Sequence, residues 1–259
     1  MNYLLAIIAG AIQGLTEFLP ISSTAHLIIF QKLFNLPENQ FGLAFDASLH
    51  LGTLLAILIF FFKDYLSVFN IKNKLILKLI IGTIPAAILG ILLEKRIESD
   101  FRSIQLIGIT LIVFSFVMII AEKFARSNVK NNQVSNFKSL VIGVSQSLAL
   151  VPGVSRSGAT ISAGLFLGLT REKAARFAFM LSGPIIAGAG AKKFLETLTS
   201  KPSGSDLALF TLGIISSFVF GYLTIKYFLR FLATNNLSPF IIYRILLGFA
   251  LLLIPLLVK

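Results

Sequence analysis

The chain has 259 residues, of which 56% are hydrophobic and 13% are charged, whereas soluble globular domains carry roughly 25% charged residues. This composition excludes an ordinary soluble enzyme, and it excludes a disordered chain, which needs low hydrophobicity and high charge. The absence of cysteine excludes a disulfide scaffold. The formal net charge is +12. Because the basic residues lie between long apolar runs, we expect them to face anionic lipid headgroups of a bilayer and expect no nucleic-acid partner.

The apolar runs define the predicted elements in chain order. A hydrocarbon core about 30 Å thick takes about 20 helical residues, and six runs are long enough to span it: about 42–62, 75–93, 104–121, 173–191, 207–229 and 240–258. Two shorter runs, about 3–12 and 139–151, have a length typical of re-entrant or interfacial segments. The first of these lacks a basic region before it and a small-residue cleavage site after it, so we expect it to be retained rather than removed as a signal peptide.

The two short runs resemble each other. The first reads GAIQ over 10–13 and leads to PISST at 20–24, and the second reads GVSQ over 143–146 and leads to PGVSRS at 152–157. This similarity indicates a duplication, with each half made of one re-entrant helix-loop-helix hairpin and three spans. Because three spans are an odd number, the second half is inverted, as in many transporters.

The predicted fold is therefore an all-α integral membrane protein with six transmembrane helices and two re-entrant hairpins in an inverted repeat. Residues 1–259 form a single membrane domain. The first repeat covers 1–122, with its hairpin at about 3–30. The second repeat covers 138–259, with its hairpin at about 139–169.

The basic residues in the loops indicate which side is cytoplasmic, because cytoplasmic loops carry an excess of Lys and Arg. With Arg156 and Arg244 set aside as site or helix residues, one side holds Lys32, Lys95, Arg96, Arg102, Lys192, Lys193, Lys201 and Lys259. The other side holds a larger set: Lys63, Lys72, Lys74, Lys78, Lys123, Arg126, Lys130, Lys138, Arg171, Lys173, Arg176, Lys226 and Arg230. We therefore expect the second side to be cytoplasmic, and both termini and the opening of the first hairpin to lie outside.

The first hairpin carries ionisable groups at membrane depth, where they are costly and mark functional sites. Gln13 and Glu17 share a helical face at i and i+4, and the proline at position 20 ends that helix. The Ser-Ser-Thr run over 22–24 provides cap chemistry for a second helix, with His26 in its first turn. Glu17, Ser23 and His26 are expected to crowd the hairpin tip. In the alternative interpretation Glu17 only pairs with a basic group and His26 is structural.

The second hairpin has the features of an anion cradle. A Pro-Gly pair breaks the helix, and SRSGAT over 155–160 leads into the next one. A helix N-terminus offers free amides and a positive dipole end, Arg156 has a planar fork suited to phosphate, and hydroxyls come from Ser155, Ser157 and Thr160. Arg156 as a counter-ion for Glu17 is the alternative, and the two interpretations are compatible.

Asp46 and His50 form a further polar pair, also at i and i+4, near one end of the first span. They either line the same cavity or bond to each other. We favour the structural pair.

The segments QGLTEFLPISSTAH at 13–26 and PGVSRSGAT at 152–160 resemble the two signatures of the bacterial undecaprenyl-diphosphate phosphatase, or bacitracin-resistance, family. The likeness extends in outline over the whole chain, including FDASLHLGT at 45–53. It implies an integral plasma-membrane hydrolase that removes the terminal phosphate from undecaprenyl diphosphate, a polyprenyl diphosphate lipid. The product, undecaprenyl phosphate, would return to peptidoglycan assembly.

The resemblance also implies roles for particular residues. Glu17, Ser23, His26 and Arg156 are the expected catalytic residues, and the expected substrate-binding residues are Gln13, Ser22, Ser155, Ser157 and Thr160. Glu17 would orient His26 or hold a divalent cation, Mg²⁺ or Ca²⁺, and no organic cofactor is implied. Many family members have a second Glu where this chain has Gln13, which removes one carboxylate from any metal site.

The nucleophile is left open at this point. Ser23 can attack with His26 as its base, His26 can attack phosphorus directly, or His26 can activate water. We favour Ser23. The rival class is a transporter or lipid flippase, which shares the inverted-repeat plan and can use Glu17 or His26 as a proton relay. The sequence is also compatible with a homodimer.

Overall fold

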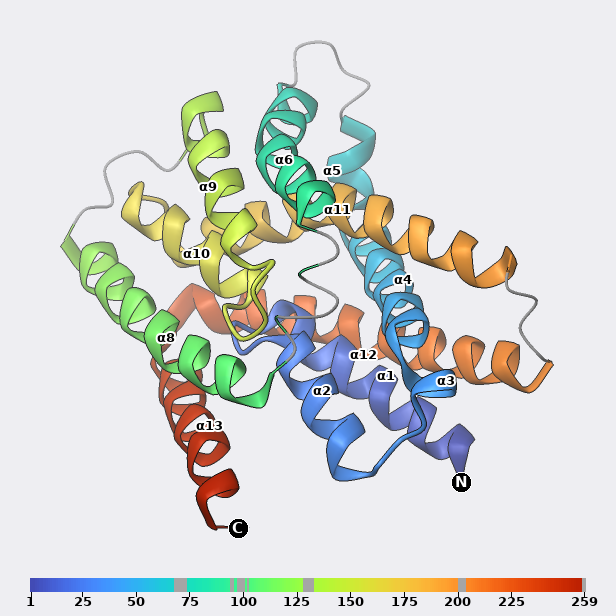
Figure 1. The fold of residues 1–259 in the computed structure, drawn as a ribbon. Coiled ribbons are helices and arrows are strands. Elements are labelled where there is room, and N and C mark those ends of the chain that lie inside the picture. Colours follow the sequence, from blue (N-terminus) through green and yellow to red (C-terminus); the bar gives the residue numbers. More distant parts are fainter. Residues whose placement is uncertain are drawn as a thin grey trace.

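The computed structural model of the chain describes residues 1–67, 74–93, 96, 101, 103–127, 133–199 and 204–257. All the regular elements within these ranges are helices (Figure 1). They are α1 (Asn2–Phe18), α2 (Ser23–Leu33), α3 (Glu38–Phe41), α4 (Leu43–Phe60), α5 (Phe62–Leu66), α6 (Leu75–Leu92), α8 (Ile104–Ser127), α9 (Asn136–Leu148), α10 (Arg156–Phe166), α11 (Arg171–Thr199), α12 (Gly204–Thr234) and α13 (Ser238–Leu257). The expectation of an all-α protein is confirmed for this part of the chain.

Two helix-turn-helix hairpins, α1–α2 and α9–α10, lie at the centre of the molecule, with the longer helices around them (Figure 1). Helix α1 ends before Leu19, whose extended backbone (ψ 142°) is the conformation favoured by a residue that precedes proline. Ser22 is the N-cap of α2, and Ser155 is the N-cap of α10. Both caps have φ of 74°, a left-handed conformation that is uncommon for residues other than glycine. The two turns therefore share an unusual backbone.

Within the described ranges, four helical segments are long and apolar enough to cross a membrane. They are Leu43–Phe60, Leu75–Leu92, Ile104–Ala125 and Leu207–Thr234. The apolar stretch of α13, Ser238–Leu253, is shorter. Helix α11 covers the predicted span at 173–191 but is not among these four segments, and charged residues occupy its first turns. The total of six spans and two re-entrant hairpins stays a prediction. Val258 at the end of the last predicted span and several of the counted basic residues lie outside the described residues: Lys72, Lys95, Arg102, Lys130, Lys201 and Lys259.

Small residues allow the hairpin helices to pack closely against the long helices. A Cβ atom built on Gly14 of α1 would lie 2.6 Å from the backbone nitrogen of Gly221 in α12. Gly143 of α9 packs directly against the backbone of Gly82 in α6. Such close backbone approach is typical of helix pairs in membranes. The first hairpin is thus fixed to α12, and the second hairpin is fixed to α6.

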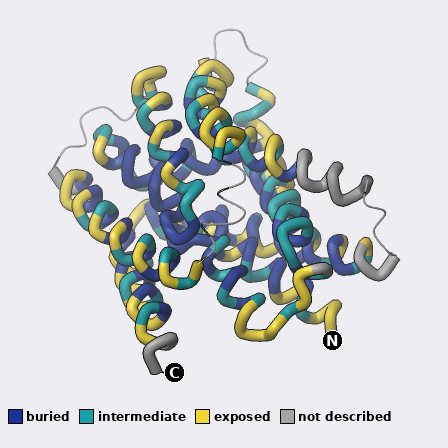
Figure 2. The backbone as a smooth tube through the Cα atoms, in the orientation of Figure 1, coloured by how far each residue is buried: buried dark blue, intermediate teal, exposed yellow. Residues whose placement is uncertain are grey.

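Buried residues concentrate where the turns of the two hairpins meet, whereas exposed residues lie on the outward faces of the helices, those of α1 and α9 included (Figure 2). On α6 the exposed side chains include Ile80, Ile84 and Ile88, which recur every four residues and so form one apolar stripe. A continuous exposed apolar surface of this kind marks contact with another apolar phase. The turns of the hairpins therefore lie inside a bundle whose outer surface suits lipid.

Candidate functional site

A cavity of about 120 Å³ lies between the tips of the two hairpins. The first hairpin contributes Glu17, Ser22, Ser23 and Thr24, and the second contributes Gln146, Ala149, Leu150, Pro152, Ser155 and Arg156. Helix α4 adds His50, and α6 and α11 add Ala86 and Ile185. The cavity is therefore polar at the hairpin tips and apolar where α6 and α11 meet it.

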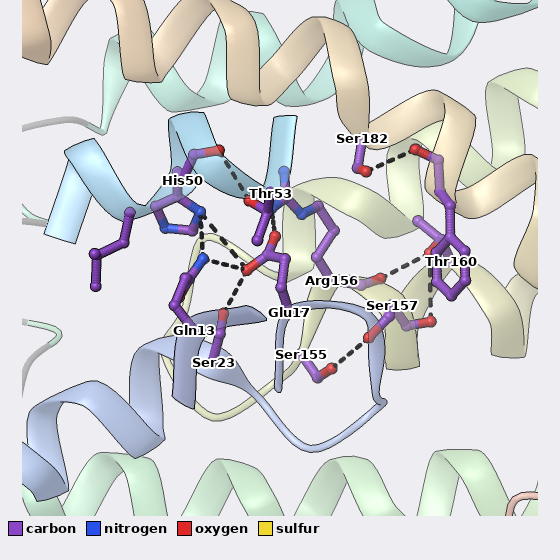
Figure 3. Close-up of polar contacts among 12 residues, drawn as sticks. Gln13, Glu17, Ser23, His50, Thr53, Ser155, Arg156, Ser157, Thr160 and Ser182 are labelled. Atoms are coloured by element: carbon purple, nitrogen blue, oxygen red, sulfur yellow. Dashed lines mark hydrogen bonds and ion pairs between the residues drawn. The ribbon is translucent and has the colours of Figure 1, made fainter. Parts of the chain in front are cut away.

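Glu17 is the centre of the polar network, and its side chain is only 3% exposed (Figure 3). Its Oε2 accepts hydrogen bonds from the Ser23 hydroxyl at 2.7 Å and from the Gln13 amide at 2.9 Å. Its Oε1 accepts a hydrogen bond from the Arg156 guanidinium, with which it forms an ion pair. The structure thus brings Glu17, Ser23 and Arg156 together, and it also contains the ion pair considered as the alternative role of Arg156.

His50 belongs to this network, so the favoured prediction of a structural pair between His50 and Asp46 is wrong. Its Nδ1 lies 2.8 Å from the Gln13 amide nitrogen and 3.6 Å from Glu17 Oε2 (Figure 3). An amide NH₂ only donates, so Nδ1 accepts and a neutral ring carries its proton on Nε2. Asp46, the partner favoured from the sequence, accepts a hydrogen bond from Gln31 at 2.6 Å. His50 therefore follows the interpretation in which it lines the cavity.

His26 does not line the cavity with Glu17 and Ser23, and its ring nitrogens are bonded to other groups. Its Nδ1 donates to the backbone carbonyl of Ser22 at 2.8 Å. Its Nε2 lies 2.7 Å from the Tyr243 hydroxyl, and the two rings stack with centroids 5.6 Å apart. Both ring nitrogens therefore have partners other than the Ser23 hydroxyl, and one of them is on α13. The structure gives no support to His26 as the base for Ser23; it shows His26 bracing the turn at Ser22.

Among the hydroxyls expected to bind substrate, those of Ser22 and Ser157 form bonds between the two hairpins, and that of Thr160 bonds within its own helix. Ser22 accepts a hydrogen bond from the backbone amide of Gly153 at 3.2 Å, and Ser157 donates to the Leu19 carbonyl at 2.9 Å. These bonds tie the two turns together. Thr160 donates within its own helix, to the Arg156 carbonyl at 2.7 Å. Of the five expected substrate-binding residues, Ser22 and Ser155 line the cavity, and the lining does not include Gln13, Ser157 or Thr160.

Arg244 of α13, which the sequence singled out only as a site or helix residue without a role, connects the two hairpins. It is fully buried and donates to the Pro20 carbonyl at 3.1 Å and to the Gly153 carbonyl at 2.9 Å. It also donates to the Ser115 hydroxyl at 3.1 Å and to a carbonyl of α8. One side chain therefore bonds both hairpin turns. The sequence feature that could have indicated this role is the presence of an arginine in an otherwise apolar helix.

The N-terminal end of α10 faces the cavity, since both its cap Ser155 and its first residue Arg156 line it. A helix N-terminus carries a partial positive charge and favours anions. Together with the guanidinium of Arg156, this end of the cavity suits phosphate oxygens.

The oxygen atoms of the site have the chemistry of ligands for hard cations. Glu17 supplies a carboxylate, and Gln13 supplies a buried Oε1 with no hydrogen-bond partner among the described residues. Those residues contain no group of three or more His, Cys, Asp or Glu that could hold a metal ion alone. Mg²⁺ is commonly bound through one or two carboxylates together with substrate phosphates. The donor set therefore fits a cation that is held largely by a phosphorylated substrate.

Comparison with known proteins gives a consistent result over nearly the whole chain. The family model described as bacitracin resistance protein BacA matches residues 6–250. A protein of Thermodesulfovibrio yellowstonii named undecaprenyl-diphosphatase is 46% identical over 239 residues, which cover 92% of each chain. A protein of the same name from Pelobacter propionicus is 44% identical over 263 residues, covering 96% of this chain and 95% of the other. The chain belongs to the bacitracin resistance protein BacA family.

Proposed function

We propose that this protein is a membrane phosphatase that removes the terminal phosphate from undecaprenyl diphosphate and releases undecaprenyl phosphate. The observation that carries the proposal is the cluster of a hydroxyl, a carboxylate and a guanidinium on Ser23, Glu17 and Arg156 at a buried cavity. The relatives at 39–46% identity carry the name of this activity. The product returns to cell-wall synthesis, and the name of the family links the reaction to bacitracin resistance.

Arg156 and the N-terminus of α10 hold the diphosphate. Phosphoryl transfer depends on positioning and charge stabilisation more than on covalent chemistry, and a preorganised cation in a water-poor cavity stabilises charge strongly. In the structure Arg156 pairs with Glu17. When the diphosphate binds, its oxygens compete for the guanidinium, so the Glu17 carboxylate becomes free to accept a proton.

Ser23 is the nucleophile in this mechanism, and Glu17 is its base. The Ser23 hydroxyl already donates to Glu17 Oε2 at 2.7 Å, within the range for proton transfer. The Ser23 oxygen bonds to the terminal phosphorus while the bridging P–O bond breaks, and the electron pair leaves with undecaprenyl phosphate. Water then attacks the phosphorus of the phosphoserine, inorganic phosphate leaves, and the proton held by Glu17 returns to the Ser23 oxygen. Gln13 bridges Glu17 and His50, which keeps the carboxylate oriented toward Ser23.

Ser23→Ala is expected to lower phosphate release from undecaprenyl diphosphate by about 1000-fold or more, because it removes the attacking oxygen. The matched control is Ser145→Ala in α9, where the hydroxyl donates to a carbonyl of its own helix at 2.7 Å. The control should retain nearly full activity. If Ser23→Ala keeps more than about a tenth of wild-type turnover, water activated by Glu17 replaces Ser23 as the nucleophile.

A divalent cation, when bound, neutralises charge on the diphosphate, and Glu17 and Gln13 Oε1 are the residues that would hold it. Gln13→Glu adds a second carboxylate and is expected to lower the Mg²⁺ or Ca²⁺ concentration for half-maximal activity by about tenfold, which corresponds to about 1.4 kcal/mol. Titration of phosphate release with each cation after treatment with a chelator measures this. An unchanged or higher half-maximal concentration would place the cation elsewhere.

An apolar cavity of about 380 Å³ suits the polyprenyl chain of the substrate. It lies between α6 and α11, and its lining includes Thr83, Ala87 and Pro184. Ala86 and Ile185, the chain neighbours of two of these residues, line the polar cavity. The two cavities therefore lie close together along the same pair of helices, which supports a path by which the lipid enters from the bilayer.

In the membrane, we place the two hairpins as re-entrant segments among six spans related by an inverted repeat. The packing supports this plan, because α1 of the first hairpin lies against α12 of the second half, and α9 of the second hairpin lies against α6 of the first half. The start of α1 and the end of α13 also lie toward the same edge of the molecule (Figure 1). The loops predicted on the other side of the membrane carry the larger number of basic residues, which is typical of the cytoplasmic side. This supports placing both termini and the opening of the site on the outer face.

A further inference from the structure

Gln146 of α9 is a polar side chain without a partner at the edge of the cavity. It is 2% exposed, and neither its Nε2 nor its Oε1 has a hydrogen-bond partner among the described residues. It lines the same cavity as Glu17, Ser155 and Arg156. Nearly all buried polar atoms in proteins have a partner, so an amide with two orphaned atoms needs an explanation.

The corresponding glutamine of the first hairpin shows what Gln146 lacks. Gln13 stands at the matching position of the repeated sequence, and its amide donates to Glu17, four residues later in α1, and to His50. Four residues after Gln146 the chain has Leu150, an apolar residue that offers no side-chain acceptor. The helix carrying Gln146 therefore leaves its amide unsatisfied.

Folding alone does not account for an amide at this position. Burying an amide without a hydrogen bond costs free energy that a leucine or methionine of similar size would not incur. The missing partner must therefore come from what enters the cavity. The neighbouring guanidinium and the helix N-terminus at Ser155 attract anions, and phosphate oxygens accept hydrogen bonds from an amide NH₂.

We propose that Gln146 is a substrate-binding residue whose Nε2 donates a hydrogen bond to a non-bridging oxygen of the diphosphate, while its Oε1 accepts from a water molecule that enters with the substrate. This inference rests on the proposed function. It gives the two equivalent glutamines different tasks: Gln13 positions the carboxylate that takes the proton, and Gln146 holds the phosphate that is attacked or released.

Gln146→Leu tests the inference, with Gln146→Met as a second variant that keeps an unbranched chain. Phosphate release from undecaprenyl diphosphate is measured over a range of substrate concentrations, and the Tm of each variant is measured alongside. The matched control is Ser162→Ala in α10, since Ser162 Oγ is also buried without a partner but does not line the cavity. This control removes an orphaned polar group without touching the site.

We expect kcat/KM of both Gln146 variants to fall by about 10- to 100-fold, the range for losing a hydrogen bond to a charged group, mainly through a higher KM. Their Tm should not fall, because no hydrogen bond of the free protein is lost. Ser162→Ala should match the wild type in kcat/KM. If the wild type is active and the Gln146 variants equal it in kcat/KM, or lose activity only as far as their Tm falls, the role of Gln146 is wrong and the proposed function stands. If the wild type releases no phosphate, the proposed function fails.

Discussion

Arg156→Ala is expected to lower phosphate release by about 1000-fold while leaving a folded protein. The variant removes the fixed cation that faces the diphosphate, and losing one preorganised charge-stabilising group commonly costs about 100- to 1000-fold in kcat. It also leaves Glu17, with a side chain only 3% exposed, without its ion-pair partner. Breaking a buried pair from one side costs about 3–5 kcal/mol of stability, so Tm should fall as well.

A second substitution separates the two effects of Arg156→Ala. The double variant Glu17→Gln with Arg156→Ala removes both charges and is expected to recover Tm without recovering activity. Arg156→Lys keeps a charge but loses the planar fork, and we expect it to remain well below wild-type turnover. Arg230→Ala, at an exposed position of α12, is the control for losing one positive charge. Wild-type turnover in Arg156→Lys would show that the guanidinium geometry has no role.

Arg244→Leu is the other change with a large expected effect, since Arg244 connects both hairpin turns to α13. The variant leaves the carbonyls of Pro20 and Gly153 without this donor, and an unsatisfied buried carbonyl costs about 1–3 kcal/mol. Once the turns are free to shift, Ser23 and Arg156 lose their alignment. A displacement of about 1 Å can cost about 100-fold in rate, so kcat/KM should fall by at least that factor.

Ser115→Ala provides the matched control for Arg244→Leu, because it removes the hydrogen bond at 3.1 Å from the guanidinium to a side chain, together with a bond of Ser115 to a carbonyl of its own helix, and leaves both bonds of Arg244 to the hairpin turns in place. We expect this control to keep most of its activity. Arg244→Lys should behave like Arg244→Leu, since one ammonium group cannot reproduce a planar fork that bonds several acceptors. Full turnover in Arg244→Lys or Arg244→Leu would contradict the role of this residue as a tie between the turns.

The parts of the site that were predictable from the sequence depend on local rules. Glu17 and Gln13 share a face because their spacing is helical, the proline after Leu19 ends α1, and a serine caps each second helix. These features need only a few neighbouring residues. The two hairpins and the closeness of Ser23 to Glu17 followed from them, whereas the ion pair of Glu17 with Arg156, 139 positions later, was considered only as an alternative.

The remaining parts depend on contacts between distant segments. His50 reaches Gln13 across 37 positions of the chain, whereas its spacing to Asp46 suggested a local pair. His26 bonds to Tyr243, which lies 217 positions later. Arg244 bonds turns that lie 224 and 91 positions away. No spacing rule within one segment anticipates such contacts, because they depend on how α4 and α13 pack against the hairpins.

The most direct test of the central claim is phosphate release from undecaprenyl diphosphate by the purified wild-type protein in detergent, where no membrane compartments exist. The expected result is one phosphate released per lipid, with undecaprenyl phosphate as the other product, in the presence of Mg²⁺ or Ca²⁺. A folded protein that releases no phosphate with either cation or without one, but moves the lipid across a vesicle membrane, would contradict the phosphatase and identify a flippase.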